Sequence, residues 1–329
     1  MNFKDLYGQA ELRRALAGAL TAGTLSHAVL ICGPSGSGKK SWGLALAAAL
    51  LCQGREYAES CGRCRSCRLF KSGIHPAFFH IRPQGRRLGI DQIRRIRGNF
   101  YLEGGNRVCL IEEAEQMTAE ACASLLKILE EPPPRLYFIL LTGRPKRLPG
   151  TIVSRCQCFT LQPLKKEEIL DLLKRQKGLA PEKALLLSRL SKGLPGMALK
   201  LAEDPSFEGR LAEASELAYR LAAGGWTSRE LLSLAESLTG REDLAFFLEL
   251  VCLFYRDGLI YLLCGSEELL VQPSEAKRWA RAASPNALEE AMEMLQKLVQ
   301  ELGETNVNRR LALEGTLLQL KRRFASCPG

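Results

Sequence analysis

The 329-residue sequence lacks any apolar run of the roughly 18 residues that a membrane-spanning helix needs. Its first residues, Met1 to Asp5, also lack the apolar core of a secretory signal peptide. We therefore expect a cytoplasmic protein with no membrane partner. In that reducing compartment, its 12 cysteines are not expected to form disulfides.

Acidic residues are the scarcer charged type. The chain has 36 Asp and Glu against 46 Lys and Arg, which gives a formal net charge of +10. A positive balance favours an acidic partner such as nucleic acid. The arginine-dense segment 82–97 is either a basic face or a solvated helix, and composition alone leaves both open because acidic residues are interspersed.

A glycine-rich turn is the main candidate for binding chemistry. It follows a buried strand expected at residues 28–32, and a helix is expected to begin near Lys39. Gly33, Gly38 and Lys39 fit the first part of the P-loop pattern, in which inward N–H groups and the helix dipole hold phosphate. The alternative is a glycine-rich turn without a ligand. The expected nucleotide-binding residues are Gly33, Pro34, Ser35, Gly36, Ser37, Gly38, Lys39, Lys40 and Ser41.

The P-loop pattern breaks directly after Lys39. The next position normally carries Ser or Thr, whose hydroxyl holds Mg²⁺ against the phosphates. This sequence has Lys40 there and places Ser41 one residue late. Because a helix turns about 100° per residue, Ser41 cannot take over that role. We therefore expect P-loop geometry with little ATP hydrolysis, and we leave ATP and Mg²⁺ binding open.

Four closely spaced cysteines predict a metal site in a loop at residues 52–67. Four thiolates suit tetrahedral Zn²⁺, and a site with all four positions filled would be structural. An iron–sulfur cluster is the main alternative, and unligated cysteines are the other. His75 could replace one cysteine, although its place before Pro76 favours a loop role. The expected ligands are Cys52, Cys61, Cys64 and Cys67.

A second buried strand, starting at Arg107, ends in Glu112 and Glu113. Such a pair has the form of a Walker B element, in which the first acid helps to hold Mg²⁺ and the second orients attacking water. The first acid is usually Asp, and Glu112 is one methylene longer. The alternative is a pair of surface acids. A third buried strand ends in Thr142, which either senses a γ-phosphate or caps the next loop.

Helix and strand patterns divide the chain into three parts. Alternating buried strands and helices predict an α/β domain over residues 1–162, with a parallel sheet covered by helices on both faces. No strand pattern follows Pro163, so we expect two helical segments, 163–206 and 207–329.

Two helices of the first part have clear patterns. Residues 3–22 are expected to form one amphipathic helix with Leu12, Leu16 and Leu20 on one face. Residues 117–132 form the clearest helix, with Thr118 as its N-cap.

The order of these motifs resembles one protein family, the bacterial clamp-loader subunits of the AAA+ ATPase class, namely the δ′ and γ/τ subunits of DNA polymerase III. The combination is more specific than any single motif, and it covers essentially the whole chain. The resemblance rests on Tyr7-Gly-Gln9, His27-Ala28, the glycine-rich turn, the cysteine quartet, His75-Pro76, Ile90 to Arg94, Glu112 to Met117, Leu125 to Pro132, Ser154-Arg155-Cys156, Tyr255 to Asp257 and Asn308 to Glu314.

The resemblance implies an AAA+ domain that carries the zinc loop, a helical lid over residues 163–206 and a helical collar over 207–329. It implies a hetero-pentamer with γ/τ and δ subunits, which opens the sliding clamp and places it on primer-template DNA. Arg155 matches the family's arginine finger, which would act in trans on ATP held by a neighbouring subunit. The alternative for Arg155 is a surface salt bridge.

This chain differs from an active γ/τ subunit at three positions, and these differences favour the δ′ branch of the family. Active γ/τ subunits have Ser or Thr after the P-loop lysine and an arginine in the lid, whereas this chain has Lys40 and Met197; Glu112 replaces the usual Asp. With Arg155 kept, we expect a δ′-type stator that hydrolyses little or no ATP. An active γ-type ATPase and a DNA-binding adaptor with a vestigial P-loop are the alternatives. A small-molecule P-loop kinase would leave the cysteine loop unexplained.

Overall fold

The computed structural model describes residues 2–54, 59–85, 87–98, 105–273, 275, 278, 282–303 and 307–325. The chain forms two compact units, Met1–Ala202 and Glu203–Gly329. Among the described residues, no helix combines the length and the hydropathy needed to cross a lipid bilayer.

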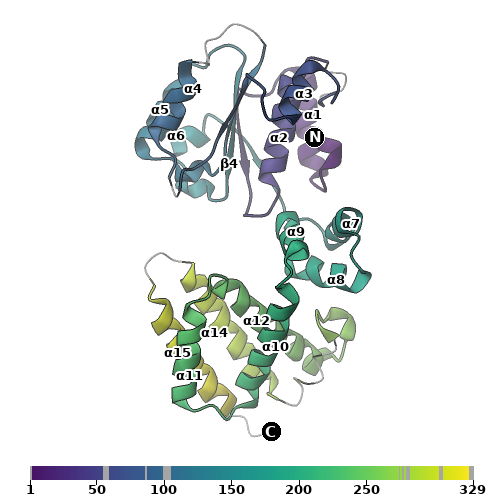
Figure 1. Cartoon of the computed structure of the whole chain (residues 1–329), viewed down its shortest axis with the longest axis vertical. Helices are drawn as coiled ribbons and strands as arrows, with labels where there is room; N and C mark the ends of the chain where they lie inside the picture. Colours follow the sequence, from purple (N-terminus) through teal and green to yellow (C-terminus); the bar gives the residue numbers. More distant parts are fainter. Residues whose placement is uncertain are drawn as a thin grey trace. The chain divides into compact units, whose positions relative to one another are not determined.

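The first unit is built on a central sheet, which Figure 1 shows between two groups of helices. The sheet has five parallel strands in the order β2-β3-β4-β1-β5. The three central strands, β1, β3 and β4, are almost completely buried, as expected for a parallel sheet with both faces covered. The predicted α/β fold is therefore confirmed. The strands are β1 (Ala28–Cys32), β2 (Phe78–Ile81), β3 (Arg107–Ile111), β4 (Leu136–Thr142) and β5 (Gln157–Thr160).

Helices cover the two faces of this sheet in groups of three. Figure 1 shows α1, α2 and α3 on one side and α4, α5 and α6 on the other. Successive residues of β4 point to opposite faces, so Ile139 packs with the first group and Phe138 with the second. The helices are α1 (Ala10–Ala22), α2 (Lys39–Leu51), α3 (Arg65–Lys71), α4 (Ile90–Arg97), α5 (Ala119–Glu130) and α6 (Gly150–Val153).

The N-terminal helix is shorter than the sequence predicted. The prediction of one helix over residues 3–22 is wrong at its start, because Phe3–Asp5 forms only a 3-10 turn and α1 begins at Ala10. Gly8 and Gln9 have φ of 62° and 54°, and left-handed residues cannot continue a right-handed helix. The predicted stripe of Leu12, Leu16 and Leu20 is buried.

Three more helices complete the first unit: α7 (Lys166–Lys177), α8 (Pro181–Leu190) and α9 (Pro195–Glu203). The first turn of α9 touches the glycine-rich turn, since Gly196 N donates a hydrogen bond to Gly36 O at 2.8 Å. A side chain at either glycine would crowd this contact. A Cβ on Gly196 would lie 3.0 Å from Gly36 Cα.

The described residues of the second unit contain helices and no strand, which confirms the predicted helical C-terminal part. Its long helix α12 packs against α10 and α14, and Phe247, Phe254 and Tyr255 of α12 are fully buried. The division into lid and collar stays a prediction; the compact unit begins at Glu203. The helices are α10 (Phe207–Ala223), α11 (Ser228–Thr239), α12 (Leu244–Cys264), α14 (Pro285–Leu302) and α15 (Arg309–Ala325).

Candidate phosphate-binding site and metal centre

The glycine-rich turn joins the end of β1 to the first residue of α2, within one residue of the predicted bounds. Gly36 and Gly38 have φ of 80° and 90°. Residues with side chains rarely adopt such angles, which explains why glycine stands at both positions. The turn therefore places the N-terminal N–H groups of a 13-residue helix beside the carboxyl ends of the strands.

A cavity of about 700 Å³ opens beside this turn. Its walls come from the turn itself, the segment after β3 and the segment after β4, because the carboxyl ends of parallel strands meet at one edge of the sheet. Four predicted site residues do not line this cavity in the part of the chain that the structure describes. They are Gly33, Ser37, Ser41 and Thr142. The predicted site residues that line it are Pro34, Ser35, Gly36, Gly38, Lys39, Lys40, Glu112 and Glu113.

The P-loop lysine is held by the turn that it follows. Lys39 Nζ donates to Gly33 O at 2.6 Å and to Pro34 O at 2.8 Å. Burial lowers the pKa of Lys39, and the carboxylate of Glu115 opposes this shift. An ammonium group has three N–H donors. Two of them hold the turn closed, and the third is left for a ligand in the cavity.

Lys40 and Glu112, the two residues that break the usual pattern, contact one another. Lys40 Nζ lies 3.0 Å from Glu112 Oε1. The same oxygen lies 2.6 Å from His80 Nε2 and 3.1 Å from Arg82 Nε. Burial by itself would raise the pKa of Glu112, but the hydrogen bonds from Lys40 and His80 outweigh burial and lower it. Glu112 is therefore a carboxylate surrounded by donors.

These residues do not fit the Mg²⁺ site of an active P-loop enzyme. Such a site needs a hydroxyl and a free carboxylate oxygen, whereas here an ammonium group stands where the hydroxyl is usual. Mg²⁺ also demands an almost ideal octahedron of oxygen ligands. The sequence predicted an extra cation near the metal position, but it gave no sign of His80 and Arg82. They reach Glu112 because β2 pairs with β3.

Two further acids line the cavity beside Glu112. Glu113 is exposed and has φ of 49°, a left-handed conformation that is costly outside glycine. Glu115, which the sequence analysis missed, accepts a hydrogen bond from Gly143 N at 3.0 Å. Glu115 thus ties the segment after β3 to the segment after β4.

Thr142 is fully buried at the end of β4. Its Oγ1 accepts a hydrogen bond from Arg144 N at 3.0 Å. In this structure the hydroxyl therefore closes the turn that follows the strand, which was the second of the two predicted roles.

Arg155 lies between α6 and the edge strand β5. Its Nη2 is 2.9 Å from Glu130 Oε1, its Nη1 donates to Thr151 O, and its side chain is 38% exposed. It is absent from the described residues that line the chain's own cavity. Arg155 thus forms a partly exposed surface ion pair in this structure.

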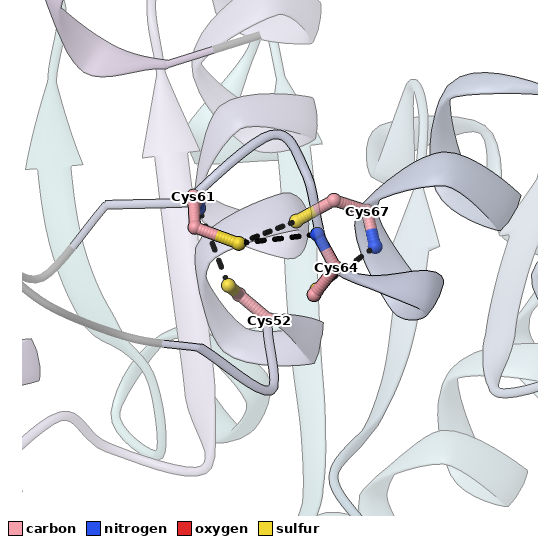
Figure 2. Close-up of side chains that lie close together, drawn as sticks. All are labelled: Cys52, Cys61, Cys64 and Cys67. Atoms are coloured by element: carbon pink, nitrogen blue, oxygen red, sulfur yellow. Dashed lines mark hydrogen bonds between the residues drawn. The ribbon is translucent and has the colours of Figure 1, made fainter.

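The four cysteines predicted as ligands come together between the end of α2 and the start of α3 (Figure 2). Their sulfur atoms all lie within 4.8 Å of one another, and Cys61 Sγ is 4.0 Å from Cys67 Sγ. Backbone N–H groups of Cys61, Cys64 and Cys67 donate to neighbouring sulfurs at 3.3–3.4 Å. This donor set could hold one metal ion.

Backbone hydrogen bonds lower the pKa values of Cys61 and Cys64, whereas burial raises those of Cys52 and Cys67. Burial by itself would raise the pKa of Cys64, but the backbone N–H groups of Cys67 and Gln53 outweigh it and lower the pKa to about 6. His75 is not part of the cluster. Its Nε2 lies 2.8 Å from Ser66 Oγ, and its Nδ1 accepts a hydrogen bond from Ala77 N. His75 therefore orders the loop before β2, in line with the predicted loop role.

Comparison with known proteins places the chain in a family. A family model described as "DNA polymerase III, delta subunit" matches residues 8–165. The chain is 34% identical to the δ′ subunit of Escherichia coli K12 over 65% of each chain. It is 32% identical to the δ′ subunit of Yersinia pestis over 93% of this chain and 92% of that one.

A more distant relative is the τ subunit of Bacillus subtilis. It is 28% identical over 92% of this chain, but the match spans only 59% of that longer protein. Because δ′ subunits match this chain at 31–33% identity over more than four fifths of their length, the chain belongs to the family of DNA polymerase III δ′ subunits.

Proposed function

We propose that this chain is the stator of a clamp loader. In this role it assembles with γ/τ and δ subunits in a hetero-pentamer and supplies Arg155 in trans for ATP-driven loading of the sliding clamp onto primer-template DNA. Membership of the δ′ family supports the proposal. The observation that carries it is the ion pair of Lys40 and Glu112, which takes up the two positions that an active subunit uses for Mg²⁺.

The setting of Arg155 supports a role in trans. The side chain is exposed and lies outside the cavity of its own chain, so a neighbouring subunit can approach it. Its partner Glu130 is 45% exposed. An exposed ion pair contributes only about 0–1 kcal/mol, so releasing Arg155 on assembly costs little. A guanidinium group beside the γ-phosphate of a neighbour would offset the charge that builds on the phosphoryl oxygens.

The proposal is tested in a reconstituted clamp loader with Arg155→Ala and Arg155→Lys. We expect both variants to assemble, and we expect ATP hydrolysis at the neighbouring site to fall about a thousandfold, with loss of clamp loading. Glu130→Ala is the matched control, because it removes the partner and leaves the guanidinium. An assembled Arg155→Ala complex with normal ATPase and clamp loading would overturn the proposal.

The alternative of an active γ-type ATPase is tested on the purified chain alone. The Lys40–Glu112 ion pair counts against it. Steady ATP turnover that disappears in Lys39→Ala would make this chain a motor subunit. We expect no turnover above that of Lys39→Ala.

The second part of the proposal is that the cysteine cluster holds one structural Zn²⁺. With Zn–S bonds of about 2.3 Å, sulfurs at tetrahedral zinc lie about 3.8 Å apart. The 4.0 Å between Cys61 Sγ and Cys67 Sγ is close to that spacing. An iron–sulfur cluster would set the sulfurs farther apart, because several atoms lie between them.

A further inference from the structure

We propose that the glycine-rich turn binds the phosphates of a nucleoside di- or triphosphate without Mg²⁺, with the ammonium group of Lys40 in the place of the metal ion. The stator role requires no nucleotide in this chain, so the inference goes beyond that role. It rests on three features: a lysine ammonium group at the metal position, a carboxylate oxygen that three donors already occupy, and a glycine-rich turn that opens on a cavity at the start of α2.

The fixed cation is Lys40. Its side chain is 48% exposed, and it lines the cavity while its Nζ contacts Glu112 Oε1. In an active subunit, Mg²⁺ is held between a hydroxyl at this position and the acid after the strand. Lys40 supplies positive charge at the same place from the chain itself. The contact with Glu112 uses one N–H of the ammonium group and leaves two for phosphate oxygens.

The carboxylate of Glu112 is already saturated on one side. His80, Arg82 and Lys40 all lie within 3.1 Å of the same oxygen atom, Oε1. A divalent ion that approached this oxygen would have to displace these donors and would be repelled by the ammonium and guanidinium groups. Mg²⁺ also gives up its water ligands reluctantly. The structure therefore disfavours metal and retains positive charge.

The phosphate cradle remains intact around Lys40. Lys39 donates hydrogen bonds to the carbonyl oxygens of Gly33 and Pro34, and its positive charge offsets their negative ends. The turn also contains an unpaired donor, the Ser37 hydroxyl, although Ser37 does not line the cavity itself. Ser37 is 4% exposed, its Oγ lies inside the turn against Gly33, and it has no hydrogen-bond partner in the part of the chain that the structure describes. A buried donor left unpaired is costly unless a ligand completes it.

This proposal predicts that Mg²⁺ affects nucleotide affinity differently here than in an ordinary P-loop. Mg²⁺ binds the phosphates of free nucleotide in solution, and this metal must be released before Lys40 can take its place. Added Mg²⁺ should therefore leave the affinity unchanged or weaken it. In a site that uses the metal, removal of Mg²⁺ weakens binding instead.

The test is calorimetric titration of the purified full-length chain with ADP and with ATP, in EDTA and in excess Mg²⁺. We expect binding in EDTA at least as tight as in Mg²⁺, and loss of binding in Lys39→Ala. A drop in affinity of about tenfold or more on chelation, which is 1.4 kcal/mol, would overturn the proposal. Failure of both nucleotides to bind in both buffers would overturn it as well.

Two variants address Lys40 itself. Lys40→Met keeps an unbranched side chain of similar length and removes the charge, and we expect it to weaken binding in EDTA about tenfold or more. The double variant Lys40→Thr with Glu112→Asp restores the usual residue types, and we expect Mg²⁺ to tighten its binding. Unchanged affinity of Lys40→Met in EDTA would contradict the assignment, with circular dichroism confirming that the variant is folded. These outcomes are independent of Arg155, so they can fail while the stator role stands.

Discussion

Lys40 Nζ and Glu112 Oε1 lie 3.0 Å apart in the wall of the cavity beside the glycine-rich turn. Each residue departs from the usual P-loop pattern, and the two departures offset one another. A cation at the hydroxyl position would repel Mg²⁺, and the longer side chain of Glu112 lets its carboxylate meet that cation. One ion pair therefore involves two of the three residues that depart from the γ/τ pattern.

This ion pair predicts a pH-dependent contribution to stability. The folded-state pKa of Glu112 is lowered, so its contribution is present above the unfolded value near 4.5 and is lost as the pH falls through the folded value. Lys40→Met removes one cause of that shift. We expect it to lower the free energy of unfolding by about 1 kcal/mol or less at neutral pH. Urea denaturation should show the difference disappearing once the pH is well below 4.5.

Lys4→Met is the matched control for this measurement. Lys4 is 75% exposed and lies 3.6 Å from Glu59, so we expect a smaller effect at neutral pH. Equal destabilisation by Lys40→Met at neutral and acid pH would contradict the electrostatic explanation.

We predict that replacing a buried aspartate of the second unit, Asp257, causes a large loss of stability. Asp257 is 1% exposed, and its Oδ2 accepts hydrogen bonds from Val271 N and Gln272 N at 2.7 Å each. Asp257→Ala leaves two buried or half-buried N–H groups without their carboxylate, which should cost about 2–3 kcal/mol in the free energy of unfolding. Thermal and urea unfolding measure this change.

Arg256→Ala is the control, because its side chain is 44% exposed and contacts the same aspartate. We expect its effect to stay below about 1 kcal/mol. Similar losses in the two variants would show that the buried hydrogen bonds are not the cause.

The contact between α9 and the glycine-rich turn predicts that Gly196→Ala is destabilising. The new Cβ would lie 3.0 Å from Gly36 Cα and Gly36 O, so the first turn of α9 has to move away. We expect a cost of about 1–3 kcal/mol and faster amide hydrogen exchange at residue 196. Gly209→Ala in α10 meets nothing within 4 Å and should be neutral or stabilising by up to about 1 kcal/mol. Normal exchange at residue 196 in the variant would rule out the close contact.

The cysteine cluster predicts one zinc ion per chain. Cys64→Ser removes one of four ligands and should abolish stoichiometric zinc, measured by mass spectrometry of the purified protein, and lower the melting temperature. Cys264→Ser changes an exposed cysteine outside the cluster and should leave the zinc content unchanged. Full zinc content in Cys64→Ser would contradict the four-ligand site, and iron in place of zinc would favour the alternative.

Because Arg155 is partly exposed, we predict that its substitution changes the ATPase activity of the assembled complex and leaves the stability of the fold almost unchanged. Its ion pair with Glu130 is partly solvated. Arg155→Ala should therefore change the free energy of unfolding by less than about 1 kcal/mol. Urea denaturation checks this before any clamp-loader assay, and a larger loss would mean that a folding defect underlies any lost activity.

Local patterns made several elements predictable. The bounds of β1 and the end of β4 follow from short apolar runs between turn residues, and they match the prediction. Thr118 accepts the predicted N-cap hydrogen bond from Ala121 N. The start of α1 was missed because the left-handed conformation of Gly8 and Gln9 leaves no trace in the apolar pattern.

By itself, the sequence determined the glycine-rich turn, the cysteine quartet and the alternation of strands and helices, because spacing along the chain sets each of these. Only the tertiary structure decided what surrounds Glu112. Sheet order places β2 beside β3 and brings His80 and Arg82 to its carboxylate, while α2 directs Lys40 to it from the other side. Strand neighbours are chosen by packing across the whole domain, so no local pattern records them.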